Sequence, residues 1–218
     1  MVIPALNEAD WVVGAIESAR APGVEVVVVD GGSRDATREL AVAAGVRVVS
    51  SPAGRAEQLA AGVRVSCGDA ILLLHADSRL PSGFDQAVAG ALEDVRTIGG
   101  AFRMRFEEAG WALRVVEWGV RLRVAIFGLP YGDQALFVRR RILEAIGGVP
   151  RVPIMEDLDL VKAMRGTGRL AMLDLSVSTS ARRYRARGVA RTLFRNAVAT
   201  VAWLFGVDRQ RVAGWYRR

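Results

Sequence analysis

The sequence predicts an α/β fold in which helices flank a mostly parallel central sheet. Short apolar runs alternate with helical segments over the first hundred residues, and carboxylates stand where the runs end. Asp30 closes the run 24–30, Asp77 closes the run 70–77, and a further acidic cluster occupies 156–159. In a parallel sheet buried on both faces, the carboxyl ends of the strands open into the crevice where ligands bind. These carboxylates therefore predict a site for a metal ion and phosphate groups.

The expected elements follow one another in regular alternation. Val2 and Ile3 begin the first strand, and Asn7 or Asp10 is positioned to cap a helix that continues through Ala19. Further strands are expected at 24–29, 46–49, 71–74 and 99–106, with shorter candidates at 136–138 and 171–173, and further helices at 35–44, 56–65, 82–93, 111–127, 156–164 and 189–205.

Length and composition favour one globular domain with a large core. The chain has 218 residues, 51% of them hydrophobic, yet it contains no run of about 18 uncharged apolar residues that could span a bilayer. The first residues lack the basic start and long apolar centre of a signal peptide, and Cys67 is the single cysteine. We therefore expect a cytoplasmic protein without an internal disulfide.

Positive charge is concentrated at the end of the chain. Residues 182–218 hold ten arginines and one acid, which gives +9, so residues 1–181 carry about −2 of the formal net charge of +7. The amphipathic segments 111–127 and 189–205 can either pack on the sheet or lie on a membrane whose anionic headgroups attract the arginines. The second alternative predicts peripheral contact with the inner face of the membrane.

Five motifs, in their order and spacing, resemble those of glycosyltransferase family 2, whose members have the GT-A fold. They are Val2-Ile-Pro-Ala-Leu-Asn-Glu8, Asp30-Gly-Gly-Ser33, Gly54-Arg55, His75-Ala-Asp77 and Glu156-Asp157, and the resemblance covers about residues 1–165. The segments 130–134 and 153–159 are most similar to a subgroup of short, non-processive members, some of which are associated with arsenosugar biosynthesis.

The resemblance implies an inverting glycosyltransferase that moves a sugar from a nucleotide-diphosphate sugar to an acceptor hydroxyl. A uridine donor is favoured and a guanosine donor is possible, and the acceptor is expected to be a small molecule or a lipid-linked compound. The implied organisation is a nucleotide-binding half over about 1–100, an acceptor half over about 101–180, and a basic helical tail over about 181–218.

Particular residues receive roles from the same resemblance. The nucleotide would be held by Pro4, Ala5, Leu6, Asn7, Glu8, Asp30, Gly31, Gly32, Arg55 and Ala76. For Asp30, the alternative is a carboxylate that only forms a turn before two glycines. Arg55 is expected near the base or the diphosphate, and the alternative is a plain surface arginine.

Asp77 would bind a divalent cation that bridges the two phosphates and neutralises the leaving group. The chain departs from the family pattern at His75, where the motif usually has an aspartate. An imidazole suits Mn²⁺ better than Mg²⁺, so His75 is either a second metal ligand, a hydrogen-bonding partner of ribose, or a histidine satisfied by the core.

The general base is expected in the acidic cluster. Asp157 is the first choice, with Glu156 and Asp133 as alternatives, since a base must lie within hydrogen-bond reach of the acceptor hydroxyl. The competing interpretation is that the acids favour the N-terminus of the helix that follows. A last set of residues would contact the acceptor or the donor sugar: Tyr131, Gly132 and Gln134.

Other functions fit the sequence less well. The Gln-x-x-Arg-Trp signature of processive synthases and the glycine-rich loops of nucleotidyltransferases and dehydrogenases are absent. A nucleic-acid-binding protein that uses the basic tail would leave the acidic strand ends unexplained, so no nucleic acid is expected. A family member that binds a sugar nucleotide without catalysis is the remaining alternative.

Overall fold

The computed structural model describes residues 1–217, with side chains through Tyr216. Its first three strands, β1 (Val2–Ala5), β2 (Val27–Asp30) and β3 (Arg47–Ser50), form a parallel sheet in that order. Valines dominate β2, and a β-branched side chain packs well on a pleated sheet that is covered on both faces. This sheet ends at the residues that the sequence motifs single out.

The other five strands continue the sheet in the order β4-β7-β6-β8-β5. Their bounds are Ala70–Leu72 for β4, Ser78–Arg79 for β5, Thr97–Phe106 for β6, Phe137–Arg139 for β7 and Arg169–Thr179 for β8. A parallel bridge between Val2 and Leu73 joins β1 to the end of β4. β6 is parallel to β8 and antiparallel to β7, and β7 is antiparallel to β4. Therefore β1, β2, β3, β4, β6 and β8 share one direction, which confirms the mostly parallel sheet.

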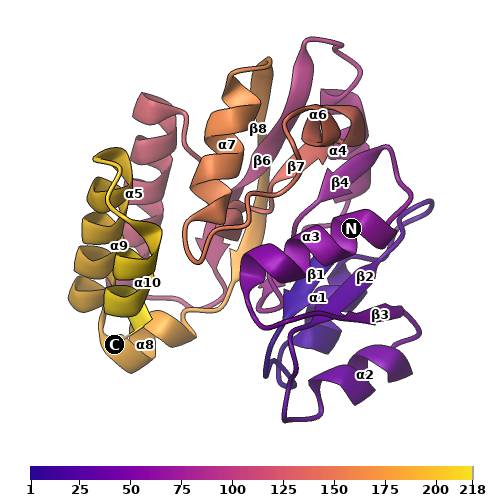
Figure 1. Cartoon of the computed structure of the whole chain (residues 1–218), viewed down its shortest axis with the longest axis horizontal. Helices are drawn as coiled ribbons and strands as arrows, with labels where there is room; N and C mark the ends of the chain where they lie inside the picture. The colour runs from indigo at the N-terminus through magenta and orange to yellow at the C-terminus, as the bar shows by residue number, and fades with distance from the viewer. Residues whose placement is uncertain (218) are drawn as a thin grey trace.

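Helices cover both faces of the sheet, as Figure 1 shows. They are α1 (Val12–Ser18), α2 (Thr37–Ala43), α3 (Arg55–Val65), α4 (Phe84–Ala91), α5 (Trp111–Phe127), α6 (Arg140–Ala145) and α7 (Glu156–Arg165). Alternate strand residues supply the two hydrophobic cores: Val28 packs with α1, whereas Val27 and Val29 pack with α3 and α7. A period of two in the strands thus creates a three-layer fold.

The end of the chain is helical, as the sequence predicts. After β8 come α8 (Arg182–Arg187), α9 (Val189–Leu204) and α10 (Arg209–Arg217), which lie beside α5 at one end of the molecule in Figure 1. A short 3-10 turn, η1 (Gly132–Gln134), precedes β7. In the part of the chain that the structure describes, no helix is long and apolar enough to cross a membrane.

One local prediction is wrong, and another gives a strand that is too short. Neither Asn7 nor Asp10 caps α1, which begins after Trp11 without a side-chain cap; Asn7 instead accepts a hydrogen bond from the backbone of Arg34 at 2.8 Å. The short strand expected at 171–173 is part of the eleven-residue β8, because pairing along β6 extends it in both directions. Tertiary pairing overrides weak local propensity there.

Close packing of the central strands gives a first prediction. A methyl group at Gly100 in β6 would lie 2.1 Å from the carbonyl oxygen of Ala171, which is backbone and cannot rotate away. Gly100→Ala should therefore lower the free energy of unfolding by about 1–3 kcal/mol, the usual cost of overpacking. Gly90→Ala in α4 is the matched control, since no atom lies within 4 Å there and alanine favours a helix. Urea unfolding of both variants checks this, and equal stability of Gly100→Ala and wild type would contradict it.

Candidate active site

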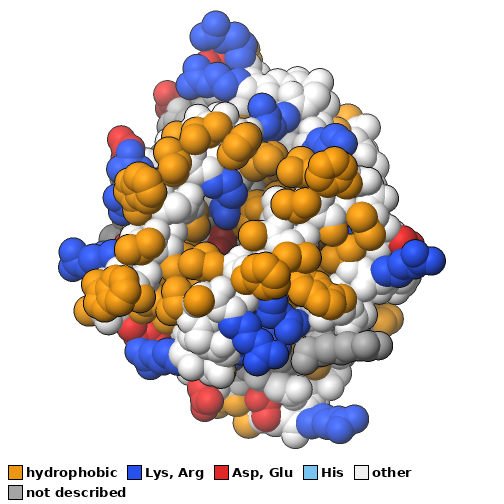
Figure 2. Space-filling view, turned by 90° about the vertical axis from the view of Figure 1, so that its left-hand side faces the viewer, with side chains coloured by type: hydrophobic (Ala, Val, Ile, Leu, Met, Phe, Trp, Pro, Cys, Tyr) orange, Lys and Arg blue, Asp and Glu red, His pale blue; other side chains and the backbone are white. Residues whose placement is uncertain are grey.

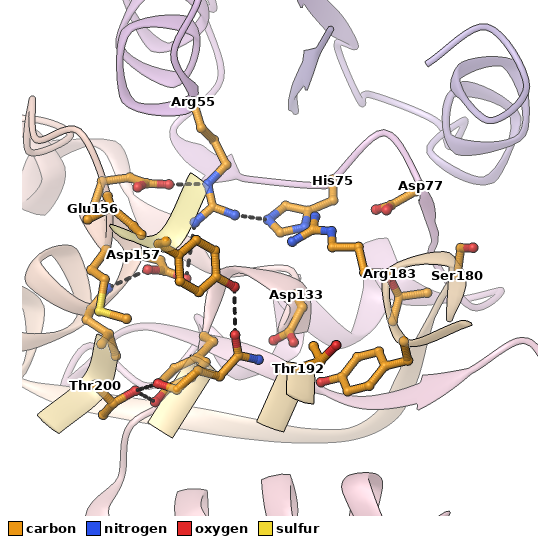
Figure 3. Close-up of a pocket in the computed structure, with 18 of the residues that line it drawn as sticks. Arg55, His75, Asp77, Asp133, Glu156, Asp157, Ser180, Arg183, Thr192 and Thr200 are labelled. Carbon is orange, nitrogen blue, oxygen red and sulfur yellow. Dashed lines mark hydrogen bonds and ion pairs between the residues drawn. The ribbon is translucent and has the colours of Figure 1, made fainter. Parts of the chain in front are cut away.

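Two cavities meet at the edge of the sheet where β1, β4 and β8 end. The backbone N–H of Ser180, after β8, donates to the carbonyl of Asp77 at 3.0 Å and holds the two strand ends together. The cavities have volumes of roughly 390 and 430 Å³ and share four lining residues, Arg55, His75, Asp77 and Arg183. Figure 3 shows several of these charged side chains converging on the first cavity. Two adjoining cavities can hold two substrates with their reacting groups between them.

The second cavity contains half of the residues expected to bind a nucleotide. Pro4, Leu6, Glu8, Arg55 and Ala76 line it. Its described lining residues do not include the other five, which are Ala5, Asn7, Asp30, Gly31 and Gly32. The Asp30 carboxylate accepts the backbone N–H groups of Gly32 and Ser33, each at 3.1 Å. These bonds fix the turn 30–33. The turn contacts the motif around Asn7, because the Asn7 N–H donates to the Ser33 hydroxyl at 2.9 Å.

Arg55 joins the two halves of the site. It begins α3 directly after Gly54, whose φ of 140° requires glycine. The guanidinium donates to Glu156 through Nε and to His75 Nε2 through Nη1, the latter at 3.1 Å, and its Nη2 lies 3.5 Å from Asp157. Burial opposes its charge, but Glu156 and Asp157 outweigh that cost and raise the pKa of Arg55. Arg55 is thus a fixed positive charge between the cavities.

His75 is an uncharged imidazole in this environment. Burial and the neighbouring guanidinium of Arg55 lower the pKa of His75 to about 3, although the carboxylates of Asp77 and Asp157 oppose the shift. Arg55 is a donor only, so His75 Nε2 accepts the bond between them and Nδ1 carries the ring proton. At neutral pH the ring is uncharged, and its one lone pair, on Nε2, is engaged by Arg55.

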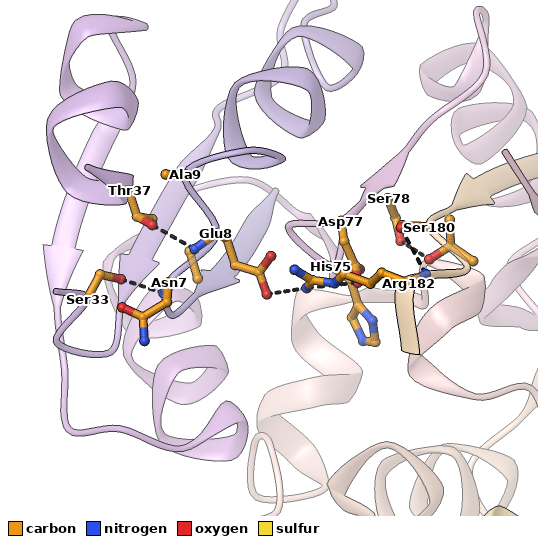
Figure 4. A network of polar contacts seen from close by, with 12 residues as sticks. Asn7, Glu8, Ala9, Ser33, Thr37, His75, Asp77, Ser78, Ser180 and Arg182 are labelled. Carbon is orange, nitrogen blue, oxygen red and sulfur yellow. Dashed lines mark hydrogen bonds and ion pairs between the residues drawn. The ribbon is translucent and has the colours of Figure 1, made fainter. Parts of the chain in front are cut away.

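Asp77 and Glu8 face a common cation, the guanidinium of Arg182 at the start of α8. Arg182 Nη2 lies 2.5 Å from a Glu8 oxygen and 3.1 Å from an Asp77 oxygen, as Figure 4 shows. The Glu8 backbone is fixed by the Thr37 hydroxyl, which accepts its N–H at 2.7 Å. The second Glu8 oxygen, Oε2, is buried and makes no hydrogen bond to the described residues. Burial raises the pKa of Glu8 against the opposing effect of Arg182.

Asp77 and His75 could contribute to the binding of a divalent cation, although they do not form a complete set of ligands. The described residues contain no group of three or more His, Cys, Asp or Glu side chains arranged around a common point. Asp77 nevertheless offers an oxygen donor, and neutral His75 would offer a nitrogen donor once Nε2 is released from Arg55; mixed oxygen and nitrogen donors suit Mn²⁺. Two protein ligands leave coordination positions open, and the oxygens of a diphosphate are suitable to fill them. Arg182 already pairs with Asp77, so a cation bound there would have to displace this guanidinium or share the carboxylate with it.

Asp157 and Asp133 stand together on the wall of the first cavity but differ in their surroundings. Asp157 accepts hydrogen bonds from the N–H groups of Gly132 at 2.8 Å and Leu158 at 2.9 Å. Burial alone would raise the pKa of Asp157, but Arg55 and the Gly132 bond hold it below its usual range. The Asp133 carboxyl has a buried oxygen, Oδ1, without a partner among the described residues, and burial raises its pKa.

Of the residues predicted to contact the acceptor or the donor sugar, Tyr131 lines the first cavity, whereas Gly132 and Gln134 hold the surrounding backbone in place. Tyr131 lines the first cavity; its hydroxyl pairs with Thr200 of α9 at 2.8 Å, and its ring lies under the Arg123 guanidinium. Gln134 is buried, donates to the Phe102 carbonyl at 3.0 Å and accepts the Tyr131 N–H at 3.2 Å. Gly132 allows close packing, since a methyl group there would lie 3.0 Å from His75 Nε2 and 3.1 Å from Asp157 Oδ2.

Several lining residues come from the C-terminal segment that sequence reasoning treated as a charged tail. Arg183 lines both cavities, and Arg182 holds Glu8 and Asp77. Further lining residues are Ser180, Tyr184, Thr192, Asn196, Thr200 and Tyr216. In the sequence, the signal for these residues is a pair of adjacent arginines, Arg182 and Arg183, shortly after a strand. The signal is informative only once 169–179 is recognised as a strand, because β8 ends at the same edge of the sheet as β4.

Comparison with known proteins agrees with this geometry. The family model described as Glycosyl transferase family 2 matches residues 1–142, so the chain belongs to that family and is a glycosyltransferase. No curated protein sequence matches the chain. Similar solved structures support the GT-A fold. A mycobacterial protein is 23% identical with a TM-score of 0.67, covering 95% of this chain and 74% of its own.

Two structures of glucosyl-3-phosphoglycerate synthase from Mycobacterium tuberculosis resemble the chain to the same extent. The complex with phosphoglyceric acid is 22% identical with a TM-score of 0.67, and the complex with Mn²⁺, uridine diphosphate and glucosyl-3-phosphoglycerate is 22% identical with a TM-score of 0.66. Each covers 95% of this chain and 79% of its own. At this identity the likeness establishes the shared fold.

The neutral state of His75 predicts a pH dependence of stability. The pKa of His75 is about 3 in the folded state and about 6.5 in the unfolded state. As the pH falls below 6.5, the imidazole therefore takes up a proton in the unfolded chain before it does so in the folded protein. The free energy of unfolding should decrease below pH 6.5, by at most about 1.4 kcal/mol per pH unit from this group. Urea unfolding of wild type and His75→Gln between pH 7 and 4 isolates the contribution. Parallel curves for the two proteins would contradict it.

Proposed function

We propose that the chain catalyses inverting, non-processive transfer of a sugar from a nucleoside diphosphate sugar to an acceptor hydroxyl. The observation that carries the proposal is the meeting of two cavities at Arg55, His75, Asp77 and Arg183. The cavity beside Pro4, Leu6 and Glu8 receives the nucleotide, and the cavity beside Asp133 and Asp157 receives the acceptor. Uridine diphosphate is the favoured carrier, with guanosine diphosphate as the alternative.

Charge at the boundary of the cavities supports cleavage of the donor. A diphosphate leaving group gains negative charge as the glycosidic bond breaks, and fixed positive groups stabilise that change. Arg55 and Arg183, which line both cavities, supply such charge. Asp77 and His75 would hold a divalent cation, Mn²⁺ in preference to Mg²⁺, which supplies further neutralisation when bound. The solved structure of the M. tuberculosis synthase with uridine diphosphate and Mn²⁺ supports this pairing of ligand and metal.

Proton removal from the acceptor is assigned to Asp157. Its carboxylate is ionised at neutral pH, its orientation is fixed by two backbone N–H groups, and it lines the acceptor cavity. Glu156 is less suited, because its carboxylate is buried against Arg55. Asp133 is a specific competitor, since its unpaired buried oxygen is ready to accept a substrate hydroxyl. In this proposal Asp133 orients the acceptor, which is a small molecule or a lipid-linked compound.

Binding of the donor is tested by thermal unfolding in the presence of nucleoside diphosphates. Uridine diphosphate at about 100 times its dissociation constant should stabilise the native state by about 2.7 kcal/mol, and Mn²⁺ should increase the effect. Asp77→Asn keeps the size of the side chain and should remove the part that depends on metal. Asp85→Asn is the matched control, because Asp85 lies in the first turn of α4 and lines neither cavity. Absence of metal-dependent stabilisation by any nucleotide would reject the cation site.

The two carboxylates of the acceptor cavity should differ in kinetics. Asp157→Asn should lower kcat by about 10²-fold or more with little change in nucleotide affinity, the range expected for loss of a positioned base. Asp133→Asn should mainly raise KM for the acceptor. Single-turnover transfer separates these effects and also distinguishes an enzyme from a protein that only binds the donor. An active Asp157→Asn protein with an inactive Asp133→Asn protein would transfer the base role to Asp133.

A further inference from the structure

The helix α5 carries two apolar stripes, of which only one packs on the sheet. Val116 and Val120 are buried in the core, as expected of an amphipathic helix. The second stripe repeats at intervals of three and four residues on the solvent side and consists of Trp111, Val115, Trp118, Leu122 and Ile126, with exposed fractions between 42% and 82%. Solvent exposure of five large apolar side chains in one line is unusual for a surface that contacts only water.

The helix α9 repeats this arrangement beside α5. Its inner side contributes Thr192, Asn196 and Thr200 to the acceptor cavity. Its outer side exposes Leu193, Phe194, Val201 and Leu204, and Phe205 follows directly with 82% exposure. Figure 2 shows these outer sides as one face, with apolar side chains gathered around a hollow and basic side chains among and around them. We call this surface the α5–α9 face.

The charge of the α5–α9 face is almost entirely positive. The two helices contain five arginines, at 114, 121, 123, 191 and 195, and a single acid, Glu117. The Glu117 carboxylate accepts the backbone N–H of Phe106 at 2.7 Å and is therefore already engaged. Arg114, Arg121 and Arg191 are exposed, and no carboxylate of the described residues lies within ion-pair distance of them. The partner of this face should therefore be both apolar and anionic.

Other arginines of the C-terminal segment do not belong to this face. Arg182 pairs with Glu8 and Asp77, Arg185 with Glu108, and Arg209 with Asp159. The surplus of +9 predicted a basic tail, and in the folded segment these three arginines pair with carboxylates of the same chain. The attraction for an anionic partner comes from α5 as much as from the tail.

A basic pocket adjoins the apolar stripes where α5, α7 and α9 end near one another. It has a volume of roughly 430 Å³ and is lined by Leu129, Lys162, Arg165, Gly166, Trp203 and Leu204. Arg165 is held there by the Phe127 carbonyl, to which it donates at 2.6 Å. Two cations beside exposed Phe127 and Leu204 provide a place for a phosphate whose hydrocarbon lies against the stripes.

We propose that the α5–α9 face docks on an anionic lipid bilayer, with a lipid phosphate at the pocket of Lys162 and Arg165. Tryptophan and phenylalanine suit the boundary between headgroups and acyl chains, and arginines attract anionic headgroups. A second copy of the chain fits this face less well, because a two-fold contact would bring the arginines of both copies together without acids to pair them. In this proposal α5 and α9 lie along the surface of the bilayer.

Docking has a consequence for the acceptor that rests on the proposed function. The same helix that presents Phe194 and Val201 to the bilayer presents Asn196 and Thr200 to the acceptor cavity. One helix is about 10 Å across, so the cavity lies close to the headgroups of a docked protein. Among the two acceptor classes, this geometry favours the lipid-linked one.

Flotation with liposomes tests the proposal without any nucleotide, so failure of donor binding does not affect the result. Wild type should bind vesicles containing 30% phosphatidylglycerol at low salt, release them at high salt, and bind pure phosphatidylcholine vesicles weakly. Replacing Arg114, Arg121 and Arg191 by Gln should lower the partition coefficient by about 10²-fold, from about 1 kcal/mol for each arginine. The matched control replaces Arg38, Arg64 and Arg141 by Gln on α2, α3 and α6, and should bind like wild type.

The exposed apolar residues are tested separately with a double variant, Trp118→Ser with Phe194→Ser, which leaves the core intact. This double variant should lose vesicle binding. The control double variant, Val42→Ser with Val95→Ser, changes two exposed positions elsewhere and should retain it. Circular dichroism verifies that all variants are folded. Equal loss in the control variants, or no flotation of wild type at any anionic content, overturns the proposal. A dimer in sedimentation that Trp118→Ser and Phe194→Ser dissociate, without vesicle binding, assigns the face to a second copy and also overturns it.

Discussion

The ion-pair network around Arg55 is the interaction on which the rest of the site depends. Its guanidinium contacts Glu156 and Asp157 from α7 and His75 from the loop after β4, so one side chain connects elements that lie 20 and about 100 residues away in the chain. Removal of the positive charge would leave two carboxylates near each other in a partly buried place, which is costly. Burial, together with this charge, lowers the pKa of His75 and keeps it neutral, and the same charge holds the pKa of Asp157 below its usual range. Arg55 therefore contributes both to the positions of His75 and Asp157 and to their protonation states.

A second charge balance controls the donor side. Arg182 satisfies one oxygen of Glu8 and one of Asp77, yet the other Glu8 oxygen remains without a partner among the described residues. An incoming diphosphate and its cation would change this balance, because Asp77 can pair with only one of the two positive groups at full strength. Arg182, which makes these contacts, is the first residue of α8. Since α8 leads directly into α9, the donor cavity and the α5–α9 face are connected through the chain.

The sequence predicted the parts of the fold that follow from local patterns. Alternating β-branched runs located β1 and β2, and the order of the motifs predicted the family that the comparison confirms. It could not predict that Asn7 serves a turn instead of α1, since both uses suit asparagine. It also missed Arg182 and Arg183 as site residues, because their meeting with Asp77 depends on the full length of β8 and its pairing with β6. Tertiary register, which no short window of sequence contains, decided these cases.

The central claim is that donor and acceptor cavities form one site joined at Arg55, and hydrogen exchange tests it most directly. Backbone exchange would be followed by mass spectrometry with and without uridine diphosphate and Mn²⁺. The account predicts slower exchange in the motif around Leu6 and at the start of α3. It predicts the same for the segment 153–158, which includes the first turn of α7, and for α8, both of which belong to the other half of the molecule. Protection limited to residues 1–80, or absent from all four segments, would contradict it.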